Sequence, residues 1–327
     1  MSDTARADPR VLPMPDLSGS FPGPFPASAY ADDIERHAAE WLGTYALVGP
    51  ERRRSALADI TGQGVARTFP TADREGLFLC AELFVWLAAF DDAHGEAAGA
   101  RDPARLARTI AGCVRLIAGH DEPPGAPGPF GAALRDLLAR FGARATPLQY
   151  LRLTGHLRDT LFGILWEAHH IDSAEHITLS DYRAMRPHTV FVRTLVATAE
   201  AALGYELPES DRSSEPVREL ESAVADLAGW INDLASYAKE TARGGPSALT
   251  LPALLMREHG CDLDEAFRRA SRMCERRSAV AAARIAELSA AEGPLSDHAR
   301  ALKSIACSYL WHTGHPRYQV ADASSGP

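Results

Sequence analysis

Apolar and polar residues along this chain alternate with the period of α-helices almost throughout. Ala, Leu, Arg and Glu dominate blocks of about 15 to 25 residues, and Pro and Gly separate these blocks. Runs of β-branched residues with period two, which are typical of strands, are scarce. We therefore predict an all-α fold, a bundle of about ten or more helices.

The helical pattern continues without an internal repeat or a mid-chain linker. A chain of 327 residues therefore predicts a single domain surrounding one apolar cavity. We assign this domain to residues 31–318 and interpret the Pro- and Gly-rich stretch 121–131 as a loop between helices. The Pro-rich segment 1–30 and the tail 319–327, which has no apolar pattern, are predicted to be flexible.

The longest apolar block runs from Leu77 to Phe90 and ends abruptly in the carboxylates of Asp91, Asp92 and Glu96. Such a block is buried, because exposing it forfeits hydrophobic stabilisation. Acidic side chains at a helix C-terminus oppose the helix dipole, and neighbouring carboxylates repel each other unless a cation intervenes. A solvated helix end is the alternative, but metal binding is the interpretation that we favour.

A second polar pattern lies inside the helical run 223–242. Asn232, Ser236 and Glu240 recur every four residues, so they drift by only about 40° and climb about 6 Å per step along one helix face. A row of hard oxygen ligands suits Mg²⁺, which completes its shell with water and phosphate oxygens. The alternative is an ordinary polar face of a surface helix.

These two patterns carry a family resemblance to bacterial class I terpene synthases (terpene cyclases). Asp91-Asp92-x-x-x-Glu96 resembles the aspartate-rich metal motif of that family. The segment Asn232-Asp233-x-x-Ser236-x-x-Lys239-Glu240 resembles its second metal motif. Arg186 lies 46 positions before Asn232, as the diphosphate-sensing arginine does, and Arg317-Tyr318 follows Trp311 as the C-terminal Arg-Tyr pair does. The resemblance extends from about residue 20 to residue 318.

The resemblance implies Mg²⁺-dependent ionisation and cyclisation of a linear isoprenyl diphosphate, with farnesyl diphosphate as the first choice and geranylgeranyl diphosphate as the second. It implies three Mg²⁺ ions, held by Asp91, Asn232, Ser236 and Glu240, with Asp92 and Glu96 in supporting roles. The diphosphate-binding residues would be Arg186, Asn232, Lys239, Arg317 and Tyr318. The aromatic wall of the cavity would include Phe84, Phe162 and Trp311, and the chain from about residue 312 would order over the bound diphosphate.

Several positions depart from the family pattern. Leu87 and Ala88 stand where an aromatic residue often precedes the first metal motif, and Leu195 stands at another frequent aromatic position. Val190, followed by Phe191, occupies the place of a helix break that commonly contains Gly. These departures concern the cavity wall and predict a roomier or differently shaped pocket.

Charge and cysteine content limit the partners and the compartment. The net charge is −9 without a basic stripe, which argues against nucleic acid and anionic membranes as partners. Five cysteines in mostly apolar contexts suit buried thiols better than a disulfide framework. The N-terminus has no signal pattern, and the block 77–90 is too short to span a bilayer, so we expect a cytoplasmic protein. A homodimer is also compatible with the sequence.

Two other functions compete with terpene cyclisation. A chain-elongating prenyltransferase would share the helical fold and the use of Mg²⁺, but it would carry a second Asp-rich motif where this chain has Asn232, Ser236 and Glu240. A non-catalytic or degenerate helical protein that binds prenyl diphosphates is the other alternative. Its motif residues would have no need to remain intact, as they do here.

Overall fold

The computed structural model describes residues 12, 14–95, 101–120, 128–171, 174–242 and 249–315, with the side chains of 175 and 238–242 left aside. Within these ranges every regular element is a helix, which confirms the predicted all-α fold. The helices are α1 (Ala31–Thr44), α2 (Glu51–Thr68), α3 (Arg74–His94), α5 (Pro103–Ile117), α6 (Pro129–Arg144), α7 (Pro147–His170), the 3₁₀ turn η1 (Ala174–His176), α8 (Leu179–Thr189), α9 (Val192–Leu203), α10 (Glu209–Arg212), α11 (Glu215–Ala242), α12 (Leu251–His259), α13 (Leu263–Ser289) and α14 (Pro294–His312).

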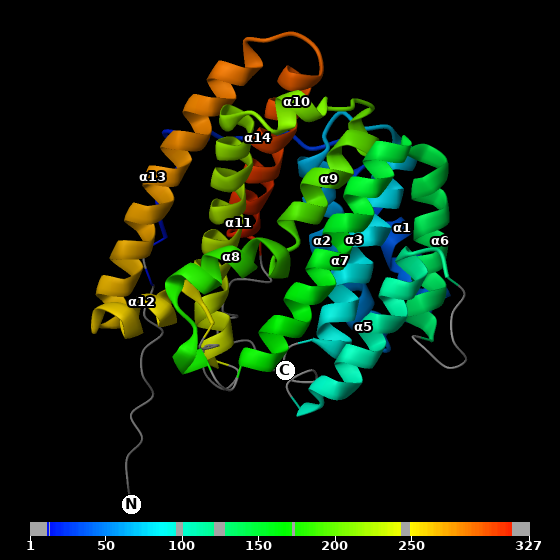
Figure 1. The fold of residues 1–327 in the computed structure, drawn as a ribbon, viewed down its shortest axis with the longest axis horizontal. Helices are drawn as coiled ribbons and strands as arrows, with labels where there is room; N and C mark the ends of the chain where they lie inside the picture. The colour runs from blue at the N-terminus through cyan, green and yellow to red at the C-terminus, as the bar shows by residue number, and fades with distance from the viewer. Residues whose placement is uncertain are drawn as a thin grey trace, which may run out of the picture.

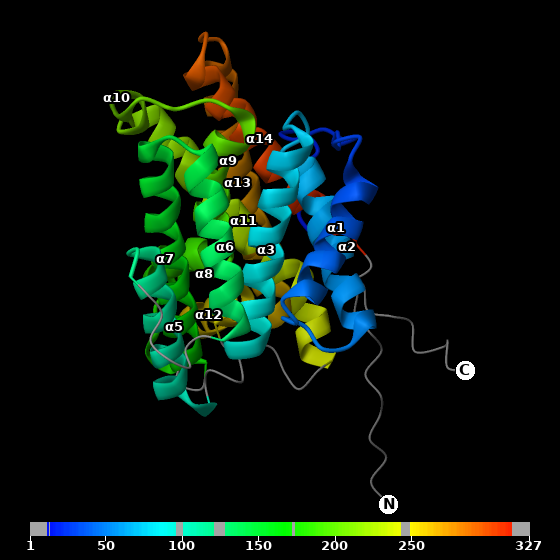
Figure 2. The same cartoon turned by 90° about the vertical axis from the view of Figure 1, so that its right-hand side faces the viewer.

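The long helices lie side by side in a single bundle (Figures 1 and 2). Helices α12 and α13 form one edge of the bundle, and α5 and α6 lie toward the other. Between them α11 packs against α13 and α14, α14 packs against α2, and α3 packs against α1, α2, α6 and α9. One apolar core of buried side chains runs through all these helices, so the molecule is a single domain.

Local sequence signals set where the helices near the cavity begin. The Asp73 carboxylate accepts a hydrogen bond from the Gly76 N–H and starts α3. Capping boxes start α7, at Thr146 and Gln149, and α8, at Thr178 and Asp181. In each box the first residue accepts a backbone N–H and the later side chain accepts a backbone N–H in return. These caps fix where α3, α7 and α8 begin, and the polar residues described below lie near the other ends of these helices.

Helix α3 is enclosed on most of its circumference, as its apolar sequence requires. Among its fully buried side chains are Trp86 and Phe90. Its one buried charge, Glu82, is 1 % exposed. The Glu82 carboxylate lies 2.6 Å from His37 Nε2 of α1 and forms an ion pair with Arg140 of α6. Pairing with both neighbours makes the burial of this carboxylate tolerable.

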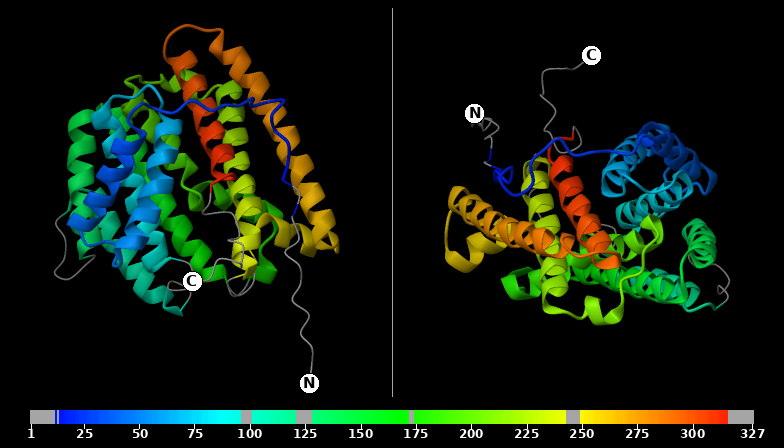
Figure 3. Two further views of the ribbon diagram at one scale, coloured as in Figure 1. Left: turned by 180° about the vertical axis from the view of Figure 1, so that it is seen from behind. Right: turned by 90° about the horizontal axis from the view of Figure 1, so that it is seen from above.

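The described part of the segment that precedes α1, for which the sequence predicts flexibility over residues 1–30, packs against the core. Leu17 and Phe21 are buried in the main core, and Ser20 Oγ lies 3.2 Å from Ser278 Oγ of α13. Figure 3 shows this segment running across the helices toward α1. Two apolar anchors therefore hold a stretch whose Pro and Gly content alone indicated flexibility. Residues 1–11, 13 and 316–327 lie outside the described residues.

The cysteines and the hydropathy of the helices agree with the sequence-based expectations. All five cysteines are free, and four of them are buried. Burial raises the pKa of the Cys274 thiol to about 12 and that of Cys307 to about 11, so these thiols are unreactive at neutral pH. No helix in the described part of the chain combines the length and the hydropathy needed to cross a membrane.

Candidate active site

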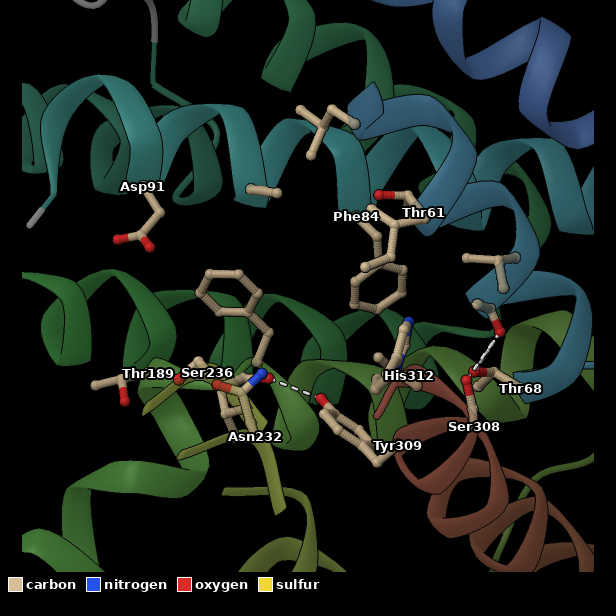
Figure 4. Close-up of a pocket in the computed structure, with 18 of the residues that line it drawn as sticks. Thr61, Thr68, Phe84, Asp91, Thr189, Asn232, Ser236, Ser308, Tyr309 and His312 are labelled. Atoms are coloured by element: carbon tan, nitrogen blue, oxygen red, sulfur yellow. Dashed lines mark hydrogen bonds between the residues drawn. The ribbon is translucent and has the colours of Figure 1, made fainter. Parts of the chain in front are cut away.

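A cavity of about 290 Å³ lies between α2, α3, α7, α8, α9, α11 and α14. Figure 4 shows its lining, with α3 on one side and α11 on the other. The lining residues are Leu57, Ile60, Thr61, Gly64, Val65, Thr68, Phe84, Ala88, Asp91, Asp92, Glu167, Arg186, Thr189, Val190, Phe191, Leu195, Asn232, Ser236, Ser308, Tyr309 and His312. Polar residues of the predicted motifs and apolar residues of the core thus share one cavity.

The α3 side of the cavity carries the first predicted metal motif. Phe84, Ala88 and Asp91 follow one another at helical spacing and all line the cavity. Asp92 also reaches it, and its carboxylate oxygen lies 3.2 Å from Arg53 Nη2 of α2. Glu96 lies outside the described residues.

The α11 side carries the second motif. Asn232 and Ser236, one helical turn apart, line the cavity, and Figure 4 shows them across it from Asp91. The side chains of Lys239 and Glu240 lie outside the described side chains. The structure thus brings Asp91, Asn232 and Ser236 together, although 141 residues separate the first two in the sequence (232 − 91).

Arg186 lies at the end of α8 and reaches α11. Its Nη2 donates to Asn232 Oδ1 at 2.9 Å and lies 2.6 Å from Asp233 Oδ1, and its Nη1 donates to Thr189 Oγ1 at 2.9 Å. The sequence reasoning selected Arg186 but gave Asp233 no role. Charge-assisted hydrogen bonds of this kind hold a guanidinium in one orientation.

The break between α8 and α9 shapes the next part of the wall. Val190 follows the last residue of α8, and Phe191 adopts a left-handed conformation with φ 64° before α9 begins. The Val190 carbonyl accepts a hydrogen bond from Tyr309 Oη of α14 at 2.8 Å. The helix therefore breaks at the position where the family pattern places glycine, but here the break is made by non-glycine residues.

The end of the cavity away from Asp91 is built by α2 and α14 (Figure 4). The Gly64 carbonyl accepts hydrogen bonds from Thr68 Oγ1 at 2.9 Å and from Ser308 Oγ at 3.0 Å. A Cβ atom on Gly64 would lie 2.7 Å from His312 Nε2. Because residue 64 has no side chain, the His312 ring can lie directly against this turn of α2.

Two predicted cavity aromatics lie elsewhere. The prediction for Phe162 is wrong, because its side chain is 58 % exposed on the outer face of α7. Trp311 is not among the described lining residues; the Arg67 guanidinium lies over its ring, 4.1 Å from the centroid. Of the departures from the family pattern, Ala88, Val190, Phe191 and Leu195 line the cavity, whereas Leu87 is buried in the core. Arg317 and Tyr318 lie outside the described residues.

The donor set fits a hard divalent cation. Asp91 and Asp92 offer carboxylate oxygens, and Asn232 and Ser236 offer an amide and a hydroxyl oxygen on the opposite wall. Oxygen donors of these types suit Mg²⁺, whereas transition metals favour imidazole and thiolate groups. Among the described residues no group of three or more His, Cys, Asp and Glu side chains gathers.

Comparisons with known proteins agree with this geometry. The model of terpene synthase family 2, C-terminal metal binding, matches residues 82–279. A (12E)-labda-8(17),12,14-triene synthase of Streptomyces anulatus is 72 % identical over 322 residues, which cover 98 % of this chain and 100 % of that protein. A labda-7,13(16),14-triene synthase of Streptomyces clavuligerus is 38 % identical over 281 residues, 85 % of this chain and 80 % of that protein.

The fold has solved counterparts as well. The structure of a variant of cucumene synthase superposes with a TM-score of 0.77 at 25 % identity, and the match covers 91 % of this chain and 99 % of that one. The metal-binding family model covers both sides of the cavity that carry Asp91, Asn232 and Ser236. The chain therefore belongs to the terpene synthase family and is a lyase.

Proposed function

We propose that this enzyme ionises a C20 isoprenyl diphosphate that already contains the two rings of a labdane, and that it releases diphosphate and a labdatriene hydrocarbon. The observation that supports this most is the cavity itself, in which Asp91 faces Asn232 and Ser236 and apolar side chains of α2, α3 and α9 line part of the remaining wall. The 72 % identity to a full-length labdatriene synthase supports the C20 skeleton.

The chemistry of a labdatriene favours a bicyclic substrate over a linear one. Ionisation breaks the bond between carbon and the diphosphate oxygen, and the electron pair leaves with the diphosphate. Loss of a proton next to the resulting allylic cation then gives one new double bond, so a triene requires a labdadienyl diphosphate. This proposal replaces farnesyl diphosphate as the preferred substrate and leaves linear geranylgeranyl diphosphate as the C20 alternative.

The metal and the diphosphate would lie between α3 and α11. Asp91, Asn232, Ser236 and Glu240 would hold three Mg²⁺ ions, with Asp92 and Glu96 in support. When bound, Mg²⁺ acts as a Lewis acid on the leaving diphosphate. Arg186 lies beside Asn232 and would donate charge-assisted hydrogen bonds to the diphosphate. Lys239, Arg317 and Tyr318 would add donors, and the tail that carries Arg317 would close the cavity against water.

Parallel incubations with different diphosphates test which substrate the enzyme uses. The purified protein is incubated with Mg²⁺ and, separately, labdadienyl, geranylgeranyl or farnesyl diphosphate, and both hydrocarbon and released diphosphate are measured. We expect a triene from labdadienyl diphosphate, and chelation by EDTA should abolish it. A product from farnesyl diphosphate alone would reject the C20 proposal, and binding without diphosphate release would favour the non-catalytic alternative. A further incubation with added isopentenyl diphosphate tests for chain elongation, which would lengthen the product.

Variants of the metal-binding residues test the site. Asp91→Ala, Asn232→Ala and Glu240→Ala should each lower kcat by about 100-fold or more, since each removes a ligand whose effect grows as charge develops. Ser222→Ala is the matched control on α11, because Ser222 accepts a hydrogen bond from Arg277 and is not among the cavity-lining residues. Near-normal kcat in any two of the three variants would refute the metal assignment.

A further inference from the structure

The aliphatic part of Arg186 crosses α11 directly over a glycine. A Cβ atom added to Gly229 would lie 2.6 Å from Arg186 Cγ, 3.6 Å from its Cβ and 3.7 Å from its Cδ. The clash would fall on the second carbon of the side chain, so Arg186 could not avoid it by moving its guanidinium alone. The arginine would have to adopt another rotamer about its first bond. Gly229 thus provides the notch through which Arg186 reaches the cavity.

One turn further along α11, Asp233 holds the head of the same arginine. The Asp233 carboxylate is 2 % exposed and lies 2.6 Å from Arg186 Nη2. Tyr182 Oη and the Leu251 N–H also donate to this carboxylate, both at 2.7 Å. Burial and the Asp233 charge hold the pKa of Tyr182 well above its usual value, so the phenol stays a donor at neutral pH.

Donors from two helices therefore fix the orientation of the Asp233 carboxylate. Tyr182 belongs to α8, one turn before Arg186, and Leu251 is the first residue of α12. Because a carboxylate with three donors has little freedom to turn, it determines where Arg186 Nη2 lies. With that nitrogen fixed, Arg186 also reaches Asn232 Oδ1 at 2.9 Å and Thr189 Oγ1 at 2.9 Å, both on the cavity wall.

We propose that Gly229 and Asp233 are positioning residues, which together form a seat on α11 that orients Arg186 toward the diphosphate site. Gly229 admits the stem of the arginine and Asp233 fixes its guanidinium; neither residue lines the cavity in the described part of the chain. This inference rests on the proposed function, since it assigns Arg186 to the diphosphate. It adds two residues that act through Arg186 rather than on the substrate.

Gly229→Ala is the first test, because the added methyl group should displace Arg186 from its contacts with Asp233 and Asn232. We expect kcat to fall at least about 10-fold and binding of inorganic diphosphate in the presence of Mg²⁺, measured calorimetrically, to weaken. Gly155→Ala is the matched control, since a Cβ on this glycine of α7 would meet nothing within 4 Å.

A double-mutant cycle separates positioning from a general structural defect. In an Arg186→Ala background, Gly229→Ala should lower kcat and diphosphate affinity no further, because the residue through which it acts is absent. If Gly229→Ala lowers both by the same factor with and without Arg186, the seat proposal is wrong. A wild-type enzyme that releases no diphosphate from any substrate would instead reject the proposed function, and calorimetry with inorganic diphosphate still tests the seat.

Asp233→Asn tests the second residue of the seat, and Asp226→Asn on the same helix is its control. Asp226 lies two turns earlier on α11, is 6 % exposed, and pairs with Arg183 at 3.0 Å and Arg277 at 2.8 Å. Both Asn variants remove a buried charge from an arginine pair and should lower the melting temperature. Only Asp233→Asn should also lower kcat at least about 10-fold and weaken diphosphate binding. Equal losses of kcat in the two variants would overturn the role of Asp233.

Discussion

At the scale of single residues, Gly64 lies where the wall of the cavity meets His312 of α14. Its absent side chain leaves room for His312, whose Nε2 and Cε1 would lie 2.7 Å and 3.0 Å from a Cβ atom there. Gly64→Ala should push the imidazole into the cavity and lower kcat/KM for a C20 substrate more than for farnesyl diphosphate. The ratio of the two kcat/KM values measures this selectivity.

A second substitution keeps that prediction testable. His312→Ala in the Gly64→Ala background removes the displaced ring and should restore the ratio, because the added methyl then meets an empty space. Gly43→Ala in α1 is the control, where the nearest atom to a new Cβ would be 3.9 Å away. A ratio that is unchanged in the single variant would show that Gly64 does not limit substrate length.

Spacing along a helix predicted which residues gather at the site, but it could not predict their wider contacts. Asn232 and Ser236 share a face because helix geometry requires it, and the structure places both on the cavity. Phe162 was misplaced because the helical pattern around it does not reveal which side of α7 is covered. The contact between Gly229 and Arg186 joins residues that are 43 positions apart (229 − 186). No local sequence pattern predicts so distant a contact.

At the scale of elements, the break between α8 and α9 places a bulky side chain in an unfavourable conformation. Phe191, with φ 64°, occupies a region that costs most L-residues roughly 1–2 kcal/mol. Phe191→Gly should relieve this cost while losing the contacts of a half-buried ring, so the melting temperature should change little. The ratio of hydrocarbon products should change, because the ring lines the cavity.

Phe90→Ala serves as the comparison for Phe191→Gly. Phe90 is fully buried in α3, and truncating a core phenylalanine costs about 3–5 kcal/mol. Urea unfolding of both variants measures the difference. A loss of stability in Phe191→Gly as large as that in Phe90→Ala would show that packing, and not backbone conformation, dominates at residue 191.

Helix boundaries were predictable where a cap or a proline marks them and less so elsewhere. Thr146 and Thr178 begin helices for reasons that the sequence shows. By contrast, the break at Phe191 forms without the glycine that would have signalled it. The segment before α1 packs through scattered apolar residues such as Leu17, Phe21 and Phe25, which do not form a periodic pattern.

At the scale of the whole molecule, half-buried histidines predict how stability depends on pH. Burial lowers the pKa of His94, His156 and His188 below the usual value. The unfolded chain therefore binds more protons than the folded one as the pH falls below about 6.5. Stability is retained above that pH and decreases as the pH falls through the lower folded pKa values.

Urea midpoints measured at pH 7.5 and pH 5.5 check this dependence. The midpoint should be lower at pH 5.5, and His156→Gln should reduce the difference, because glutamine does not titrate. His120→Gln is a suitable control, since His120 is exposed at the end of the turn that follows α5. Identical pH dependence in wild type and His156→Gln would remove His156 from the explanation.

The carboxylate of Glu82 also has a consequence for synthesis of the chain on the ribosome. Its two partners, His37 and Arg140, flank it in the sequence, and a growing chain emerges from its N-terminus. Until Arg140 has emerged, the apolar block 77–90 carries one charge that is not yet fully neutralised, and such a charge opposes aggregation. The residue that joins α1, α3 and α6 in the finished protein should thus also oppose aggregation of the unfinished one. Replacing it with leucine should therefore lower soluble expression more than the loss of stability alone explains.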